Sequence, residues 1–400
     1  MLAARYNRTV IAHHSAGTGK GRQTIREAGR RWANAPVRRG VSGLVLRVLF
    51  LALAQTAPAQ LAPIKPPPGW QQVPSGTGAC SVEKSCEELA PAMIQSAQGA
   101  SPLEGNLREL ARLAQQSQPI SSEALSVWVA EALRRAGVDR LHTEKLGSQV
   151  TSPADAQVVV GEIRGREKPN EFVVLSAHLD TRVAGDGADD DPADAAVVID
   201  AARVIHGSGS LPRRSIRFLI FTGTRQRNSG FETYLTTHRA ELNSAAAAVL
   251  FGIGNKSIVG FCLNGRKDIL AAANETLAPV RQLDAKELTL DAPFRLDSLD
   301  FVLEGIPTLA ANASWPKEAP AVRASNAELD AATLAELKRH VAVAALAAYA
   351  LADAPQRIGT RQPRAGIEQL LQETGLAQEM RREGLWIAWE NGERGRPRSD

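Results

Sequence analysis

The chain has 400 residues, is 44% hydrophobic and carries a formal net charge of +4. Length alone allows two or three domains. Residues 1–60 hold ten basic residues and one acidic residue, so the remaining chain carries about −5, and the basic composition gives no argument for a nucleic-acid-binding protein.

The N-terminal region has the pattern of a secretory leader. Residues 44–54 form an apolar run that is too short to span a bilayer. Arg38 and Arg39 precede this run, and Ala57-Pro58-Ala59 follows it as a small-x-small cleavage site. We therefore expect cleavage after Ala59, a periplasmic or secreted protein, and no integral membrane segment in the mature chain. The Arg-rich residues 1–40 are then either an over-long start or disordered.

Residues 60–100 are predicted to be a linker, because the first part of this stretch is rich in proline. Cys80 and Cys86 are close together in it, and an oxidising compartment would favour a disulfide between them. Cys262 lies in an apolar run and is expected to be a buried free thiol.

Residues 101–355 alternate between helical and strand-like patterns. Helices are predicted over 101–115, from Ser121 or Ser122 to Gly137, over 194–206 and over 329–351. Strands are predicted over 158–163, 172–177, 215–222, 247–253 and 259–263, with a strand or strand–turn over 301–310 around Gly305 and Pro307. The near-continuous apolar strands predict an α/β fold with a mostly parallel sheet covered by helices on both faces.

Residues 356–400 are predicted to form a C-terminal helix and a basic tail. Trp386 and Trp389 in this region are expected to pack against the body of the protein. His340, on the long Ala-rich helix, is expected to be a surface or capping residue.

The candidate site begins at the end of the strand 172–176, with His178 and Asp180. The loop from Gly187 to Asp191 follows and leads into a helix. Two-metal hydrolysis needs histidine and carboxylate ligands, a bridging carboxylate and a general base, and strand ends are where an open α/β sheet presents them. His178 and Asp190 lie where such ligands belong, and Asp180 would support the imidazole.

Seven segments, taken in this order and spacing, resemble the exported co-catalytic zinc exopeptidases that include bacterial leucyl aminopeptidases and plasma glutamate carboxypeptidase. The likeness covers roughly residues 103–353 and implies a zinc exopeptidase-like, three-layer α/β/α sandwich with a mostly parallel mixed sheet. The segments are 160–165, 177–180, 185–191, 213–218, 258–261, 265–268 and 305–309.

The resemblance implies five metal ligands and a general base, and most of them are replaced in this chain. His178 would hold one metal and Asp190 would bridge the two. The base position is Thr224, and the other three ligand positions are Arg225, Gly252 and Arg323. A Thr-Asp-His group of the family keeps only Asp297.

Two of the replaced ligands are arginines, which changes the charge of the site. A guanidinium cannot lose its proton to bind a metal, and it would repel a metal pair at short range. We expect Arg225 and Arg323 to point into the former metal cleft and to neutralise the carboxylates there, which are Asp189, Asp190 and Asp191.

These observations predict an exported, catalytically inactive exopeptidase-like protein that needs no cofactor and binds a peptide or protein in the former active cleft. One alternative is an active zinc aminopeptidase or dipeptidase with a rearranged site, such as one metal on His178, Asp190 and Asp297. A second alternative is a scaffold that binds nothing in the cleft.

The leader gives the first testable prediction. N-terminal sequencing of the mature protein should begin at Gln60, because signal peptidase cleaves after small-x-small sites. Finding residues 1–40 on the mature protein would contradict it.

Overall fold

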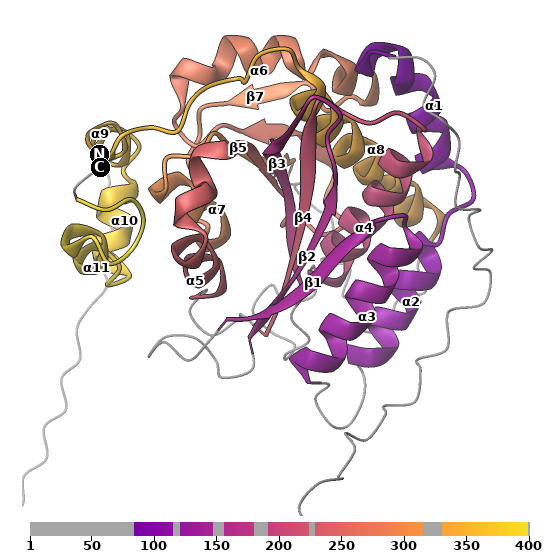
Figure 1. Cartoon of the computed structure of the whole chain (residues 1–400), viewed down its shortest axis with the longest axis horizontal. Helices are drawn as coiled ribbons and strands as arrows, with labels where there is room; N and C mark the ends of the chain where they lie inside the picture. Colours follow the sequence, from indigo (N-terminus) through magenta and orange to yellow (C-terminus); the bar gives the residue numbers. More distant parts are fainter. Residues whose placement is uncertain are drawn as a thin grey trace, which may run out of the picture. The chain divides into compact units, whose positions relative to one another are not determined.

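The structure is a computed structural model that describes residues 84–114, 121–146, 156–179, 191–223, 229–314 and 330–398. Their centre is an eight-stranded sheet in the order β1-β2-β4-β3-β5-β8-β6-β7 (Figure 1). The strands are β1 (Arg140–Lys145), β2 (Gln157–Ile163), β3 (Lys168–Leu179), β4 (Arg214–Thr222), β5 (Ala245–Leu250), β6 (Ile258–Cys262), β7 (Glu287–Thr289) and β8 (Thr308–Ala313).

The four central strands β4, β3, β5 and β8 run parallel to one another. β2 pairs antiparallel with β4, and β6 pairs antiparallel with β8. The sheet is therefore mixed with a parallel centre, as the sequence predicts. We call the edge at which β3, β4, β5 and β8 end the carboxyl edge.

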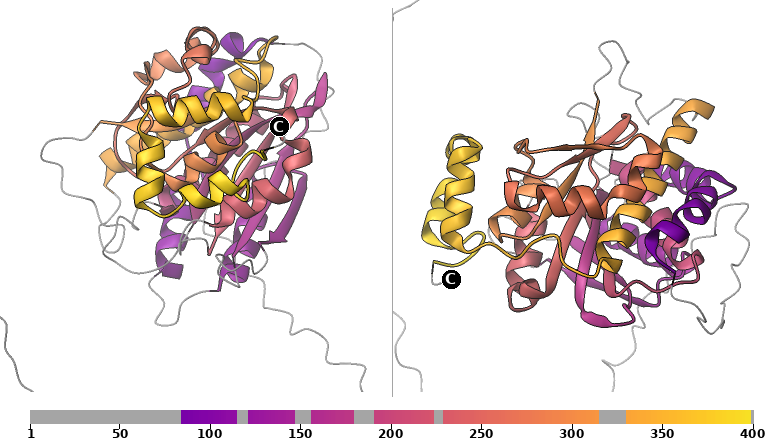
Figure 2. Two further views of the ribbon diagram at one scale, coloured as in Figure 1. Left: turned by 90° about the vertical axis from the view of Figure 1, so that its left-hand side faces the viewer. Right: turned by 90° about the horizontal axis from the view of Figure 1, so that it is seen from above.

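Helices cover both faces of the sheet, which confirms the predicted three-layer fold (Figures 1 and 2). Alternate strand residues supply the two cores: Val173 and Leu175 face one, and Phe172 and Val174 face the other. The first face is covered by α1 (Cys86–Gln98), α2 (Leu103–Ala114), α3 (Ser122–Arg135), α4 (Asp191–Gly207) and α8 (Ala331–Asp353).

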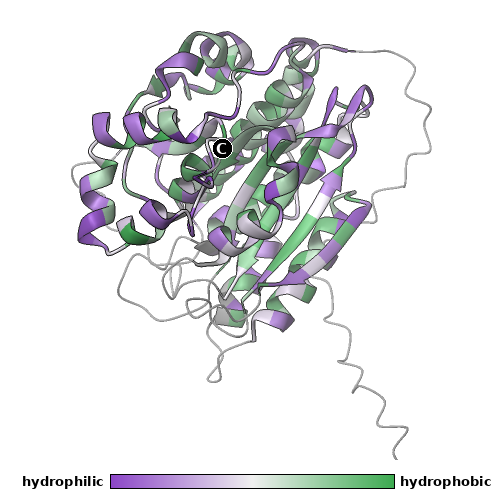
Figure 3. Cartoon of the chain, turned by 60° about the vertical axis from the view of Figure 1, so that its left-hand side comes forward, coloured by the Kyte–Doolittle hydropathy of each residue, from purple (hydrophilic) through white to green (hydrophobic). Residues whose placement is uncertain are grey.

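The second face is covered by α5 (Ser229–Thr237), the 3₁₀ helix η1 (Arg239–Ser244) and α7 (Leu296–Leu303). The remaining short elements lie around β6 and β7: η2 (Lys267–Ile269), α6 (Leu270–Thr276) and η3 (Ala278–Leu283). Central strands buried on both faces are hydrophobic along most of their length, as Figure 3 shows.

Residues 86–98, which the sequence analysis placed in the linker, form helix α1. Ser85 caps it: its hydroxyl accepts from the Glu88 amide, and the Glu88 carboxylate accepts from the Ser85 amide at 2.7 Å. Leu89 and Met93 then bury one face of the helix. The sequence analysis missed this capping box because the proline-rich residues before it led to the prediction of a linker.

Cys86 is a free, buried thiol in this structure, and its side chain belongs to the core beneath α1. Burial raises the pKa of Cys86 to about 12, so the thiol is held in its unreactive form. The expected Cys86 partner, Cys80, lies outside the described residues. Cys262 is also a buried free thiol, as predicted.

Residues 301–303 were expected to be extended but lie in the last turn of α7. Gly305 ends the helix with a φ of +76°, and an added Cβ there would be 2.5 Å from the carbonyl oxygen of Gln362. β8 starts only at Thr308. Short apolar runs suit a strand and a buried helix equally, so periodicity could not separate the two.

The C-terminal region forms three helices rather than one helix and a tail. α9 (Arg364–Glu373), α10 (Leu376–Arg382) and α11 (Trp386–Asn391) group next to α7, as Figures 1 and 2 show, and share a third core with it. Trp389 is buried in that core, and the Arg364 guanidinium lies 3.8 Å from its ring centroid. The prediction that the tryptophans pack against the body is confirmed.

His340 was expected at the surface but is fully buried in α8. Its Nε2 lies 3.1 Å from the Glu336 carboxylate, which gives the imidazole a polar partner inside the fold. Among the described helices, none is long and apolar enough to cross a membrane.

Trp389→Ala should lower the free energy of unfolding by about 3–5 kcal/mol, because it empties a core position and removes the ring under Arg364. Ile387→Ala is the matched control on the same helix, since Ile387 is 67% exposed, and should change stability by less than about 0.5 kcal/mol. Urea unfolding measures both. Equal effects would show that α11 does not pack as described.

Candidate functional site

The carboxyl edge brings together residues that are far apart in the sequence. In the β3–β5 ladder Ser176 pairs with Leu250, and the Phe251 amide donates to the Ser176 carbonyl at 2.9 Å. His178 and Gly252 each follow two residues after this last pair, at the ends of adjacent strands. Leu250 also pairs with Ala310 of β8, and Asn312, two residues after Ala310, lines the same hollow as Gly252.

His178 lies at the end of β3 and is half-buried. Phe231 of α5 contacts its ring edge-on, with 5.6 Å between the ring centroids and an interplanar angle of 86°. Phe231 stacks in turn on Phe221 of β4, at 3.9 Å between centroids. An aromatic wall from α5 and β4 thus holds the imidazole in place.

Gly252 is exposed and has no side chain to offer a ligand. The loop that it begins is held by Asp194 of α4, whose carboxylate accepts hydrogen bonds from the amides of Ile253 at 3.3 Å and Gly254 at 2.9 Å. Asp194 is only 1% exposed, so these backbone donors compensate the cost of burying its charge.

Several predicted site residues lie outside the described residues: Asp180, Asp189, Asp190, Thr224, Arg225 and Arg323. Of Asp191 and Asp297 the structure describes only the backbone, at the first residue of α4 and in the first turn of α7. Their expected contacts stay predictions. Of the ligand positions that the structure does describe, His178 keeps a nitrogen donor and Gly252 has no donor.

His178 and Gly252 on their own do not supply the donors of a co-catalytic metal pair. Such a pair needs several His and carboxylate ligands that converge on common points. Within the described parts of the chain, no three His, Cys, Asp or Glu side chains are arranged to hold a metal ion.

A hollow of about 230 Å³ opens beside Gly252 at the carboxyl edge, and we call it the edge pocket. Its polar lining is mainly cationic or neutral, from Arg295, Lys256 and Asn312, with Asp291 as the acidic exception. Its other lining residues are Gly252, Ile253, Cys262, Pro293 and Ala313. The pocket occupies the place where open α/β sheets bind ligands.

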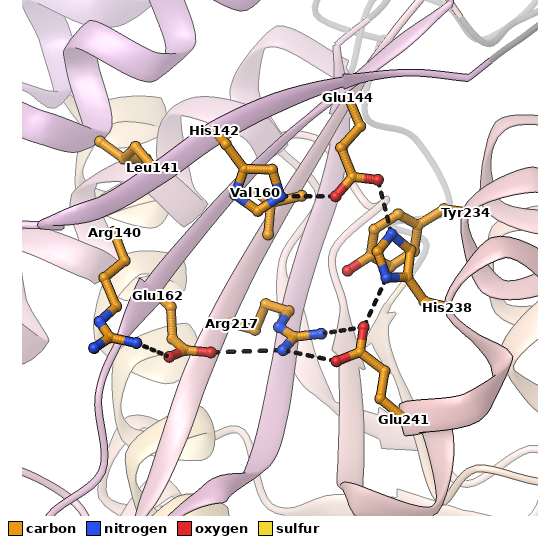
Figure 4. Close-up of a pocket in the computed structure, with 10 residues that line it drawn as sticks. All are labelled: Arg140, Leu141, His142, Glu144, Val160, Glu162, Arg217, Tyr234, His238 and Glu241. Atoms are coloured by element: carbon orange, nitrogen blue, oxygen red, sulfur yellow. Dashed lines mark hydrogen bonds and ion pairs between the residues drawn. The ribbon is translucent and has the colours of Figure 1, made fainter.

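A larger hollow of about 440 Å³ lies over β1, β2 and β4, on the face that carries α5 and η1 (Figure 4). Glu144 accepts from His142 and His238 at 2.7 Å each. The other ring nitrogen of His238 lies 2.7 Å from Glu241, which also pairs with Arg217 at 3.2 Å.

This network joins an edge strand to the segment after α5. His238 faces a carboxylate at each of its two ring nitrogens. The charged groups satisfy one another, and we call this network the clasp. Sequence reasoning missed it because its members come from β1, β4 and the segment of His238 and η1, which are far apart in the sequence.

Comparisons with known proteins agree with the architecture. Residues 158–345 match the model of peptidase family M28. Carboxypeptidase Q of Xenopus laevis is 27% identical over 172 residues, which are 42% of this chain and 37% of that protein. Carboxypeptidase Q of Homo sapiens is 24% identical over the same number of residues. The chain thus spans little more than a third of the length of these curated relatives.

Two solved structures share the fold. A peptidase M28 precursor from Shewanella amazonensis superimposes with a TM-score of 0.56 at 14% identity, covering 70% of this chain and 99% of that one. The LapA aminopeptidase of Legionella pneumophila gives a TM-score of 0.51 at 16% identity, covering 70% and 78%. At these identities the likeness establishes the fold.

Glu144→Gln tests the clasp. Burial alone would raise the pKa of Glu144, but the hydrogen bonds from His238 and His142 outweigh it and lower the pKa. Stability from this group is therefore present above its ordinary pKa of 4.5 and is lost as pH falls through the lowered value. The substitution should cost about 1.5–3 kcal/mol at pH 7, and the difference should narrow below pH 4.5.

The matched control is Glu104→Gln, which removes an exposed i,i+4 pair with Arg108 and should cost less than about 0.5 kcal/mol at either pH. Chemical denaturation across pH 3.5–7 measures both variants. A Glu144→Gln effect that does not depend on pH would rule out the ionised clasp.

Proposed function

Since this chain carries a peptidase family M28 domain in residues 158–345, we propose that it is an exported zinc exopeptidase-like protein that no longer catalyses peptide hydrolysis and instead binds a peptide or protein segment in the former active cleft. The observation that carries this proposal is the position of Gly252. It lies beside His178 at the carboxyl edge, where the exopeptidase pattern requires a carboxylate ligand.

The chemistry of hydrolysis needs more than His178 can supply. A two-metal site activates water and stabilises the charge that develops on the scissile carbonyl, and it needs several anionic ligands and a general base to do so. The sequence has Thr224 at the base position and arginine at two further ligand positions. These replacements support loss of the metal pair, and we assign no catalytic step to the remaining residues.

The carboxyl edge keeps what peptide binding needs. The edge pocket combines polar groups, from Arg295 and Asn312, with the apolar walls of Ile253, Pro293 and Ala313. A few convergent polar groups on an apolar lining are typical of ligand sites. The rigid strand ends and the Asp194-anchored loop hold this lining in place without ligand.

The alternative is an active peptidase with a rearranged site. It is favoured by one observation, the retained imidazole of His178 at the end of β3. It would need Asp190 and Asp297 to converge on the same ion. A scaffold without any ligand is the remaining possibility, and the two experiments below separate all three.

Zinc should not bind stoichiometrically to the purified mature protein at neutral pH, and zinc addition or chelation should leave the melting temperature unchanged. A metal held only by the native state at 100 times its Kd would stabilise the protein by about 2.7 kcal/mol. That stabilisation would raise the melting temperature by several degrees. A zinc-dependent shift that disappears in His178→Ala, together with peptidase activity, would establish the active alternative instead.

Peptide binding should be lost when the cleft is filled. Gly252→Trp places a bulky ring at an exposed glycine whose φ is not positive, so the fold should tolerate it. Gly207→Trp is the matched control, at an exposed glycine of α4 where an added Cβ meets nothing within 4 Å. Fluorescence anisotropy with a fluorescein-labelled tetrapeptide mixture should show binding to wild type and Gly207→Trp only. No binding to wild type would favour the scaffold.

A further inference from the structure

Arg295 is the residue of the edge pocket that points most clearly to a ligand. It is half-buried immediately before α7, and within the described residues its guanidinium makes one hydrogen bond, to the Ala311 carbonyl at 3.4 Å. No carboxylate within the described part of the chain forms an ion pair with it. Arg361 shows the contrast: its guanidinium pairs with buried Glu304 at 2.5 Å. Most of the five N–H donors of Arg295 are therefore available to a ligand.

Asn312 supplies a second donor to the same pocket. It lies near the end of β8 and is half-buried. Its side-chain amide makes no hydrogen bond to any residue that the structure describes. Lys256 adds a positive charge at the rim, where its Nζ lies 3.3 Å from the Ile253 carbonyl. Arg295 and Lys256 are half-buried in this lining, whereas Asp291, the one acidic residue that lines the pocket, is exposed.

The floor of the pocket strengthens this charge by excluding water. Cys262 is only 4% exposed there, and Pro293 and Ala313 add apolar surface. Burial raises the pKa of the Cys262 thiol, and the positive charge of Arg295 opposes this rise, so the thiol lies within the field of the guanidinium. Charge–charge interactions are stronger against such a low-dielectric wall than in open solvent.

The size of the pocket limits what it can take. At about 230 Å³ it is smaller than the roughly 300–1,000 Å³ of sites for drug-sized molecules, so it fits one residue of a larger ligand. A planar guanidinium beside an amide matches the geometry of a carboxylate, which accepts two parallel N–H bonds.

We propose that the edge pocket is a carboxylate-binding subsite, in which Arg295 forms a bidentate pair with the carboxylate and the Asn312 amide donates to it. The carboxylate is either the C-terminus of a bound peptide or an acidic side chain. The statement that a peptide carries this carboxylate rests on the proposed function. Recognition of a carboxylate by the pocket does not depend on that function.

The first test uses small probes with the wild-type protein. N-acetylglycine anion should shift the Arg295 Nε–H and Asn312 side-chain NMR signals in a saturable manner, and N-acetylglycinamide should not. Arg295→Gln should weaken N-acetylglycine binding about 10- to 100-fold. Arg295→Lys should recover part of the affinity for N-acetylglycine, because lysine keeps the positive charge but lacks the two parallel N–H donors of the guanidinium. Arg140→Gln, which alters an exposed arginine in the other hollow, is the control and should bind as wild type does.

The second test identifies the source of the carboxylate. Acetyl-Ala-Ala-Gly with a free or amidated C-terminus tests the terminal group, and acetyl-Ala-Glu-amide against acetyl-Ala-Gln-amide tests the side chain. One of the two pairs should differ about 10-fold or more with wild type, and the difference should vanish in Arg295→Gln.

The outcomes separate this inference from the proposed function. Peptides that bind equally with and without a carboxylate overturn the subsite and leave peptide binding intact. N-acetylglycine that binds through Arg295 while no peptide binds supports the subsite and refutes the peptide-binding role. If the wild-type protein binds the acids and the corresponding amides equally well, the subsite is overturned, even if the variants fail to fold.

Discussion

The hydrogen-bonded register of the parallel strands is the constraint on which the rest of the site depends. Because β4, β3, β5 and β8 run in one direction, their ends meet at one edge and fix which residues become neighbours. This register places Leu250, two residues before Gly252, between Ser176 of β3 and Ala310 of β8. In a sheet of this kind, a few substitutions at strand ends can remove the catalytic residues, while the buried strands and helices remain unchanged.

Under the proposed function, charge would explain how such an edge changes from catalysis to binding. A metal pair requires an excess of carboxylates, and it neutralises them. When a ligand position becomes glycine and others become arginine, the edge has less need for a cation and more attraction for an anion. The lining of the edge pocket agrees with this change, since its half-buried charged residues are Arg295 and Lys256. Carboxylate recognition would then use the place where metal chemistry occurred.

Much of the fold could be predicted from the sequence, and the failures have physical reasons. Apolar runs at strand period located β2 to β6, because strands buried on both faces leave little ambiguity. The last turn of α7, residues 301–303, was mistaken for the start of a strand, since a short apolar run suits either element. His340 was misplaced because burial of a histidine depends on a partner, Glu336, that tertiary packing selects.

The site was only partly predictable. Motif order located His178 and Gly252, which follow the ends of the adjacent strands β3 and β5. Arg295 and Asn312 were not identified, because each is unremarkable in its own segment and gains significance only where β8 and the start of α7 meet the edge pocket. Asp194 was likewise invisible as a loop anchor, since its partners are backbone amides about sixty residues away.

The central claim is that the replaced positions, rather than the fold, removed the metal site. Zinc titration calorimetry on a variant that combines Thr224→Glu, Arg225→Glu, Gly252→Asp and Arg323→His tests it most directly, with the wild-type protein alongside. The account predicts stoichiometric zinc uptake by the combined variant and none by wild type. Tight, stoichiometric zinc binding by wild type, or no zinc binding by a folded combined variant, would contradict it.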